Sequence, residues 1–235
     1  MLKKKHKGLL TIILARKGSR RILNKNLRKI GSNSLVEMTI KFALKLKNYS
    51  DVIVSTDDLK IIKIAKKYKV LVPGLRPKSL SGRYSSSLNV VKYVIKWYKN
   101  EFKKDVNGII LLQPTSPFRQ LSLIVKSILS FKKRKFNYVS ISKNKDYKKN
   151  KLYINKKNIL ELPSKNKVPN CYTNGNFYIL NASKIKTNTL ETILDSKTKG
   201  VMIKSKKFSL DIDTEKDLKE ARRYNNILKK KNNLK

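Results

Sequence analysis

The residues best suited to chemistry lie on one cationic loop near the start of the chain. An apolar run over Leu9–Leu14 stops at a loop with one glycine, no acidic residue and five cations: Arg16, Lys17, Arg20, Arg21 and Lys25. A loop at the carboxyl end of a buried strand lies where open α/β sheets bind ligands. Gly18 alone lacks the glycine spacing of a phosphate-binding loop, so a bound polyphosphate would be held mainly by side chains. A solvated basic loop is the alternative.

Two side chains of this loop are natural clamps for phosphate groups. Arg16 offers a planar, bidentate fork, and Lys25 offers a compact point charge. Asn26 could reach a ribose or a phosphate oxygen. For any one of these residues a solvated loop is the simpler interpretation, but the set favours polyphosphate binding.

A pair of carboxylates near the end of the chain is suited to a hard cation. Asp211 and Asp213 alternate around Ile212, so in an extended segment both carboxylates face one side while Ile212 packs into the core. Mg²⁺ usually takes only one or two protein carboxylates. Helix capping is the alternative, because Asp213 and Thr214 precede a helical pattern. The two roles can coexist, and we favour metal binding.

Two further groups of polar residues follow apolar patterns. Gln113 ends the apolar run Gly108–Leu112 and is expected to project its amide into a cleft, or else to satisfy backbone groups where Pro114 stops the strand. Arg76 and a serine cluster that includes Ser85 and Ser87 precede a helical pattern, where serines commonly act only as caps.

The elements that must position these residues alternate between strand and helix. Continuous apolar runs predict strands at Leu9–Leu14, Val52–Val54, Val70–Val72, Gly108–Leu112 and Tyr138–Ile141. Helical spacing is carried by four groups: Ile40, Ala43, Leu44 and Leu46; Ile61, Ala65 and Tyr68; Leu88, Val91, Ile95 and Tyr98; and Leu218, Ala221, Tyr224 and Leu228, with Thr214 as a cap. This alternation predicts one α/β domain of three layers with a mixed, largely parallel sheet.

The domain is expected to span residues 8–228 of the 235-residue chain. Residues 1–7 and 229–235 are predicted to be basic tails. The stretch 143–167 is nearly all Lys and Asn, with apolar islands at Leu152–Ile154 and Ile159–Leu162, and is predicted to be a surface excursion or a partly disordered insert.

Composition limits the classes of function. Cys171 and His6 are the only cysteine and histidine, which argues against a disulfide, a zinc site or a histidine-dependent triad. With no long apolar span and no apolar core for a signal peptide, the chain is expected to be cytoplasmic and to bind no membrane. The formal charge of +42 raises a nucleic-acid-binding protein as a rival. The excess is mostly scattered Lys, which fits a base-composition bias better than a specific nucleic-acid footprint.

Five short motifs occur in order along the chain: A-R-x-G-S at Ala15–Ser19, V-S-T-D-D at Val54–Asp58, L-R-P at Leu75–Pro77, Q-P-T-S-P at Gln113–Pro117 and D-I-D-T at Asp211–Thr214. With them the sequence resembles the acylneuraminate cytidylyltransferases from about Leu10 to Ala221. The resemblance implies a nucleotide-diphospho-sugar transferase-like fold and Mg²⁺-dependent transfer of CMP from CTP to the anomeric hydroxyl of a nine-carbon keto-sugar acid, with release of pyrophosphate, for surface glycan synthesis.

The resemblance also assigns roles to residues. Arg16 and Asn26 match nucleotide-contacting positions, and Lys25 matches a lysine beside the phosphates, so Arg16 and Lys25 are the predicted catalytic residues. Arg76, Ser85 and Ser87 match contacts to the base and the ribose. Gln113 matches a residue of substrate recognition, and Asp211 and Asp213 match the metal ligands. Residues 143–167 match an arm that joins two subunits, which implies a homodimer.

The sequence departs from the family pattern in ways that bear on the sugar. Arg21 and Leu23 replace a glycine and a proline, and Arg83 replaces an aspartate. Thr173 follows Tyr172 where the family has an arginine. At position 21 the arginine is similar to the pseudaminic acid enzymes. The segment Gln113–Pro117 is instead similar to the matching segment of the sialic and legionaminic acid enzymes. A cytidylyltransferase for pseudaminic, legionaminic or KDO-like acids therefore stays open, as does an inactive relative.

Overall fold

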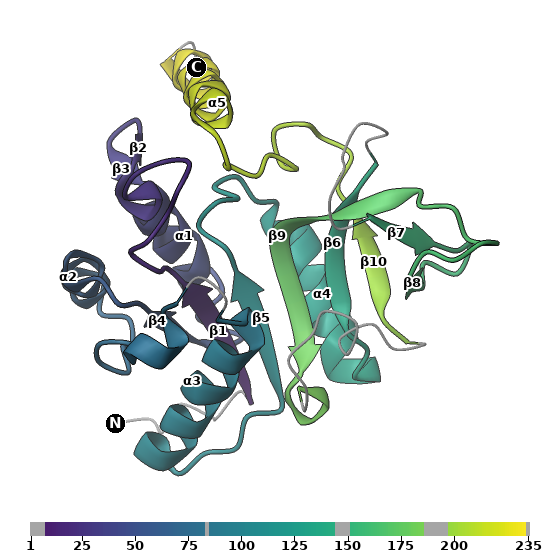
Figure 1. The fold of residues 1–235 in the computed structure, drawn as a ribbon, viewed down its shortest axis with the longest axis horizontal. Helices are drawn as coiled ribbons and strands as arrows, with labels where there is room; N and C mark the ends of the chain where they lie inside the picture. The colour runs from purple at the N-terminus through teal and green to yellow at the C-terminus, as the bar shows by residue number, and fades with distance from the viewer. Residues whose placement is uncertain (1–7, 83–84, 144–150, 186–196, 234–235) are drawn as a thin grey trace.

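The computed structural model describes residues 8–82, 85–143, 151–185 and 197–233, and its centre is a mixed β-sheet (Figure 1). Along the sheet the order is β10 (Lys199–Met202), β6 (Tyr138–Ser142), β9 (Cys171–Asn181), β5 (Gly108–Leu112), β1 (Leu9–Leu14) and β4 (Asp51–Ser55). β1 pairs in parallel with both β4 and β5, and β10 pairs in parallel with β6. Among these six described strands β9 alone runs against the others, being antiparallel to β5 and β6. The predicted mixed, largely parallel α/β architecture is confirmed.

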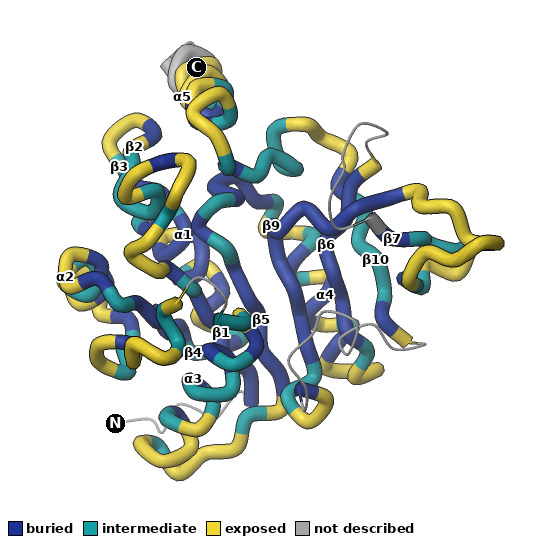
Figure 2. The backbone as a smooth tube through the Cα atoms, viewed as in Figure 1, coloured by how far each residue is buried: buried dark blue, intermediate teal, exposed yellow. Residues whose placement is uncertain are grey.

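Helices cover both faces of the sheet. One core cluster joins the sheet to α1 (Leu35–Leu44), α2 (Leu59–Lys67) and α4 (Leu121–Arg134), and a second joins the opposite face to α3 (Ser87–Phe102). β1 contributes Leu9 and Ile13 to the first cluster, and Leu10 and Ile12 to the second. Burial on both faces explains why its apolar run is continuous rather than alternating, and Figure 2 shows the sheet as the buried centre of the molecule.

The predicted elements are largely present where the patterns put them. β1 and β5 have the predicted bounds, and β4 and β6 extend the predicted strands by one or two residues. The strand predicted at Val70–Val72 was wrong. Only Leu71 pairs, in a single parallel bridge to Ile53. Pro73, which has no N–H, comes two residues later and interrupts the ladder, and pairing resumes only at Leu75, which bridges to Thr56.

The segment predicted as an excursion contains a small hairpin. β7 (Lys151–Ile154) pairs with β8 (Leu160–Glu161) and with the start of β9, so the two apolar islands are its strands. Residues 144–150 of this segment lie outside the described residues. So do residues 1–7 and 234–235 of the predicted tails, whereas the backbone of residues 229–233 continues the last helix.

That last helix, α5 (Glu215–Asn233), packs through a third cluster. Leu218 and Ala221 meet Phe118, Leu35 and Ile212 there. Thr214 caps the helix as predicted: its hydroxyl accepts from the Asp217 amide at 3.3 Å, and Asp217 Oδ2 accepts from the Thr214 amide at 2.7 Å. The side chain of Leu228 lies outside the described residues.

The remaining described elements are short. They are the strands β2 (Lys29–Ile30) and β3 (Asn33–Ser34), which form a separate pair, and the 3₁₀ turns η1 (Lys25–Leu27), η2 (Lys78–Leu80) and η3 (Ala182–Lys184). No helix in the described part of the chain is long and apolar enough to cross a membrane.

Candidate active site

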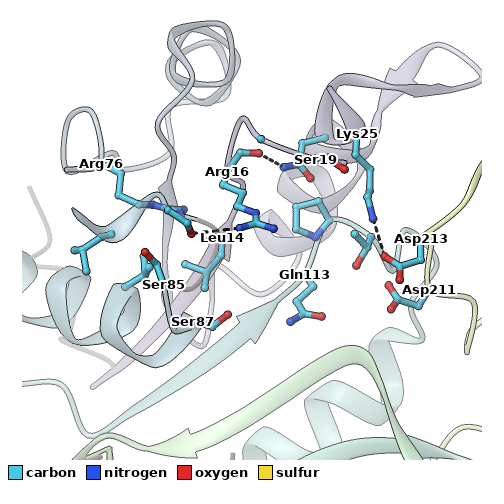
Figure 3. Close-up of a pocket in the computed structure, with 17 residues that line it drawn as sticks. Leu14, Arg16, Ser19, Lys25, Arg76, Ser85, Ser87, Gln113, Asp211 and Asp213 are labelled. Atoms are coloured by element: carbon cyan, nitrogen blue, oxygen red, sulfur yellow. Dashed lines mark hydrogen bonds and ion pairs between the residues drawn. The ribbon is translucent and has the colours of Figure 1, made fainter. Parts of the chain in front are cut away.

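A cleft of about 390 Å³ opens at the carboxyl ends of the parallel strands β1, β4 and β5. The chain leaves β1 toward β4 on one side, and β5 lies on its other side, so this edge is the switch point at which open α/β sheets bind ligands. All nine predicted site residues line the cleft: Arg16, Lys25, Asn26, Arg76, Ser85, Ser87, Gln113, Asp211 and Asp213. Figure 3 shows most of them around the one hollow.

The cationic loop forms one wall. Arg16 is exposed in the cleft, and its Nη1 donates to Gly82 O at 3.4 Å. Asn26 Nδ2 donates to Arg16 O at 2.8 Å, so the side chain of Asn26 holds the loop's first turn. A second hollow of about 570 Å³ continues along this loop, lined by Arg16, Arg20, Arg21, Lys25, Ser81 and Asp213 with two small residues of the loop. The concentration of cations favours a polyanion.

The two aspartates line the same cleft and adjoin this loop. Ile212 is fully buried between them, and both carboxylates reach the same cleft, although the segment is not a strand of the sheet. Asp213 Oδ1 accepts from Lys25 Nζ at 2.9 Å, and its Oδ2 pairs with Arg21. The hydrogen-bonded cap of α5 is supplied by Thr214 and Asp217, which leaves the Asp213 carboxylate directed at the cationic loop.

Asp211 is the more deeply placed carboxylate. Burial raises its pKa above the usual range, while a hydrogen bond from the Thr115 side chain acts in the opposite direction. Asp211 Oδ1 is buried without a hydrogen-bond partner among the described residues. An orphaned carboxylate oxygen beside a second carboxylate fits a hard cation. In the described ranges no three or more His, Cys, Asp or Glu side chains come together in a way that could hold a metal ion. A cation bound by Asp211 and Asp213 would therefore need phosphate or water as further ligands.

The far end of the cleft is built on β4 and the start of α3. Arg76 is buried; its Nε donates to Ser55 Oγ at 3.1 Å and its Nη2 donates to Ser55 O. Burial lowers the pKa of this guanidinium. Ser86 is the residue that caps α3, accepting from the Leu88 amide at 3.2 Å, so Ser85 and Ser87 are not needed as caps. Arg83 lies outside the described residues.

Gln113 follows β5 and lies against a glycine of β9. Gly175 has φ of +70°, and a Cβ built on it would lie 2.6 Å from Gln113 Oε1. The glycine therefore allows the amide to occupy its place at the cleft. Thr173, at the position of the family's arginine, is buried in β9.

Gly175→Ala is expected to destabilise the protein by about 1–2 kcal/mol, because a non-glycine residue at positive φ is strained. It should also displace the Gln113 side chain. Chemical denaturation measures the loss. Gly18→Ala is the matched control, since a Cβ at Gly18 meets nothing within 4 Å. Equal stability of the two variants would show that the close approach at Gly175 is tolerated.

Two residues that contribute to this site carried no predicted role. Asp57 Oδ1 accepts from the Lys17 amide at 2.7 Å and so ties the cationic loop to the end of β4. Asp57 lies three residues after the predicted strand Val52–Val54, within the motif V-S-T-D-D, and that was the available signal. Thr115 O accepts from the Ile212 amide at 2.8 Å and holds the aspartate segment against β5. Nothing in the sequence pattern identifies that pairing.

Comparison with known proteins gives consistent matches. A family model described as cytidylyltransferase matches residues 10–233. The chain is 31% identical over 226 residues to the CMP-N,N'-diacetyllegionaminic acid synthase of Legionella pneumophila, covering 88% of this chain and 91% of that protein. It is 29% identical over 150 residues to a pseudaminic acid cytidylyltransferase of Campylobacter jejuni, covering 63% and 64% of the two chains.

A solved structure shares the fold. It is a CMP:2-keto-3-deoxy-manno-octonic acid synthetase complexed with CTP, which superposes with a TM-score of 0.70 at 14% identity and covers 92% of this chain and 97% of that one.

Proposed function

The chain belongs to the cytidylyltransferase family, and from that premise we propose that it transfers CMP from CTP to the anomeric hydroxyl of a sialic-acid-like nonulosonic acid. In the reaction the hydroxyl oxygen bonds to the α-phosphorus of CTP, the bond from that phosphorus to the bridging oxygen breaks, and pyrophosphate leaves with release of the hydroxyl proton. The observation that carries the proposal is the cleft itself, where a cationic loop and a carboxylate pair line one hollow and meet at Lys25 and Asp213.

The protein's part in such a transfer is mainly positioning and electrostatic stabilisation. Arg16 and Lys25 are proposed to neutralise the triphosphate as charge moves toward the pyrophosphate. Lys25 is well placed, because its ammonium is fixed by Ile212 O at 2.8 Å as well as by Asp213. Arg76, Ser85 and Ser87 lie at the other end of the cleft and are proposed to bind the base and the ribose, with Asn26 on the nucleotide's phosphate or ribose side.

Asp211 and Asp213 are proposed to hold Mg²⁺. The orphaned Asp211 Oδ1 supports this assignment. When bound, the ion would reduce the negative charge of the triphosphate. Within the described residues Asp213 bonds to Lys25 and Arg21, so Lys25, a proposed phosphate contact, also orients a proposed ligand of the metal.

The sugar acid is proposed to be N,N'-diacetyllegionaminic acid or a close sialic-type acid. Support comes from the Legionella relative, which spans nearly the whole chain, and from the Q-P-T-S-P segment shared with that group. Gln113 is the proposed contact to the sugar. Thr173 supplies no cation for the sugar carboxylate, so that role must fall to another residue.

Pyrophosphate release measures the proposed activity. Purified protein is incubated with CTP and Mg²⁺ together with N-acetylneuraminic, N,N'-diacetyllegionaminic, pseudaminic or KDO acid. The highest specificity constant is expected for N,N'-diacetyllegionaminic acid. Preference for pseudaminic acid would reassign the substrate, and no release with any acid would favour an inactive relative.

Nucleotide choice gives a separate prediction. With Mg²⁺ in ~150 mM salt, CTP is expected to bind more tightly than ATP or GTP, because the Arg76–Ser87 end of the cleft selects the base while salt screens general attraction to polyanions. Isothermal titration calorimetry measures the three affinities. Equal binding of the three nucleotides would leave only nonspecific attraction to the charge of +42.

A homodimer is proposed on the β7–β8 hairpin and the segment after it. Leu162 is 47% exposed within residues 143–167, which resemble the subunit-joining arm of the family, and Val168, directly after them, is 73% exposed. The enzyme is proposed to act in the cytoplasm, where CTP is supplied.

A further inference from the structure

Arg119 ends the segment Q-P-T-S-P-F-R but does not line the cleft. Its side chain is buried, with 8% of the residue exposed. The guanidinium donates from Nη2 to Gln113 O at 2.6 Å and from Nε to Asn176 O at 3.0 Å. A third, longer bond of 3.5 Å runs from Nη1 to the hydroxyl of Thr39 on α1. The two shorter bonds end on main-chain carbonyls, one directly after β5 and one within β9.

The charge of this guanidinium has no carboxylate partner in the described part of the chain. Burial lowers its pKa to about 9, so it remains cationic at neutral pH. The ring of Phe42 lies 5.7 Å from the guanidinium carbon. A buried cation is costly unless its hydrogen bonds are satisfied, so the carbonyls that it binds must be held in place.

The two carbonyls flank the contact between Gln113 and Gly175. Gln113 is itself one acceptor, and Asn176, the other, directly follows Gly175. Asn176 Nδ2 also donates to Phe118 O at 2.7 Å and to Phe208 O at 2.8 Å. Phe208 begins the segment that leads to Asp211. The guanidinium therefore fixes the end of β5 to β9 where Gly175 lies close to the Gln113 amide.

We propose that Arg119 is a positioning residue that sets the Gln113 amide in the cleft by holding the main chain at Gln113 and beside Gly175. A planar fork suits this task, because its donors point in fixed directions to both carbonyls. Lysine would keep the charge but not the fork. The consequence for sugar-acid binding rests on the proposed function, whereas the position of the amide does not.

The test compares Arg119→Lys with Gly175→Ala, which disturbs the same contact without changing the buried cation. The side-chain amide signals of ¹⁵N-labelled protein report the environment of Gln113, and its signal is identified by its absence in Gln113→Met. Ile128→Val is the matched control, because it destabilises the buried face of α4 and leaves Arg119, Gln113 and Gly175 themselves unchanged.

Both Arg119→Lys and Gly175→Ala are expected to shift the Gln113 signal, and Ile128→Val to leave it unchanged. Arg119→Lys should raise the KM for N,N'-diacetyllegionaminic acid about tenfold or more while the Kd for CTP, measured by calorimetry, changes little. In the Gln113→Met background the same substitution should add no further increase. An unshifted Gln113 signal in folded Arg119→Lys would overturn the proposal, even if the melting temperature fell.

A shifted signal combined with a normal KM in Gln113→Met would have a different meaning. It would support the positioning role of Arg119 and contradict the proposed contact between Gln113 and the sugar.

Discussion

Asp213→Asn is expected to reduce turnover by about a hundredfold to a thousandfold, the loss typical of removing one charged group that stabilises a transition state. The substitution keeps the shape of the side chain but removes the charge that pairs with Arg21 and Lys25. Because Asp213 is half-exposed and the cap of α5 does not depend on it, folding should be largely retained. Pyrophosphate release at saturating CTP and sugar acid measures the loss, and thermal melting checks the fold.

Asp217→Asn is the control that separates metal binding from helix capping. Asp217 accepts from the amides of Asp213 and Thr214 at 3.0 and 2.7 Å and completes the cap of α5. Its substitution should cost about 1 kcal/mol of stability with little change in turnover. If Asp213→Asn behaved like Asp217→Asn, and Asp211→Asn also kept a near-normal rate, the metal assignment would be wrong.

The parallel half of the fold could be predicted because its strands are buried on both faces. A strand such as β5 must be apolar at every position, and that continuous pattern is visible in one sequence. Of the cleft residues, Arg16 and Gln113 followed from the same fact, since loops at the carboxyl ends of such strands meet at one edge. The other cleft residues were predicted from the family resemblance, with the alternation of Asp211 and Asp213 around Ile212 as a further signal.

The antiparallel strand β9 could not be predicted in this way. Its sequence is C-Y-T-N-G-N-F-Y-I-L-N. The asparagines and the glycine in its first half are typical of a loop, although Asn174 and Asn176 are buried in the strand. Asn174 Nδ2 donates to Ser142 Oγ at 2.8 Å, and Asn176 donates to carbonyls of two distant segments. These partners lie more than 30 residues away in the sequence. The hydrogen bonds that allow these amides to be buried therefore cannot be recognised before the fold is known.

Arg119 shows the same limit at the site itself. From the sequence, an arginine at the end of a motif is as consistent with an exposed ligand contact as with a buried side chain that holds the main chain in place. Only the carbonyls of Gln113 and Asn176 decide between them, and a carbonyl's direction is a property of the main chain rather than of the residue type.

Arg16→Lys is expected to lower the specificity constant for CTP by roughly tenfold to a hundredfold, which corresponds to about 1–3 kcal/mol of transition-state binding. Arg16 follows directly after the buried Ala15 at the end of β1, and its carbonyl is held by Asn26. The backbone thus delivers the guanidinium to the cleft beside Lys25 and the second, cation-lined hollow. Lysine keeps the net charge but loses the bidentate fork.

Arg134→Lys is the matched control, because it makes the same exchange on an exposed residue in the last turn of α4. Neither variant changes the net charge of +42, so general attraction between this basic chain and CTP is the same in both. Any difference in the initial rate of pyrophosphate release then measures the geometry of one guanidinium at the cleft. If the two variants had equal specificity constants, Arg16 would act only as part of a diffuse positive field, and the cationic loop would attract the nucleotide without gripping it.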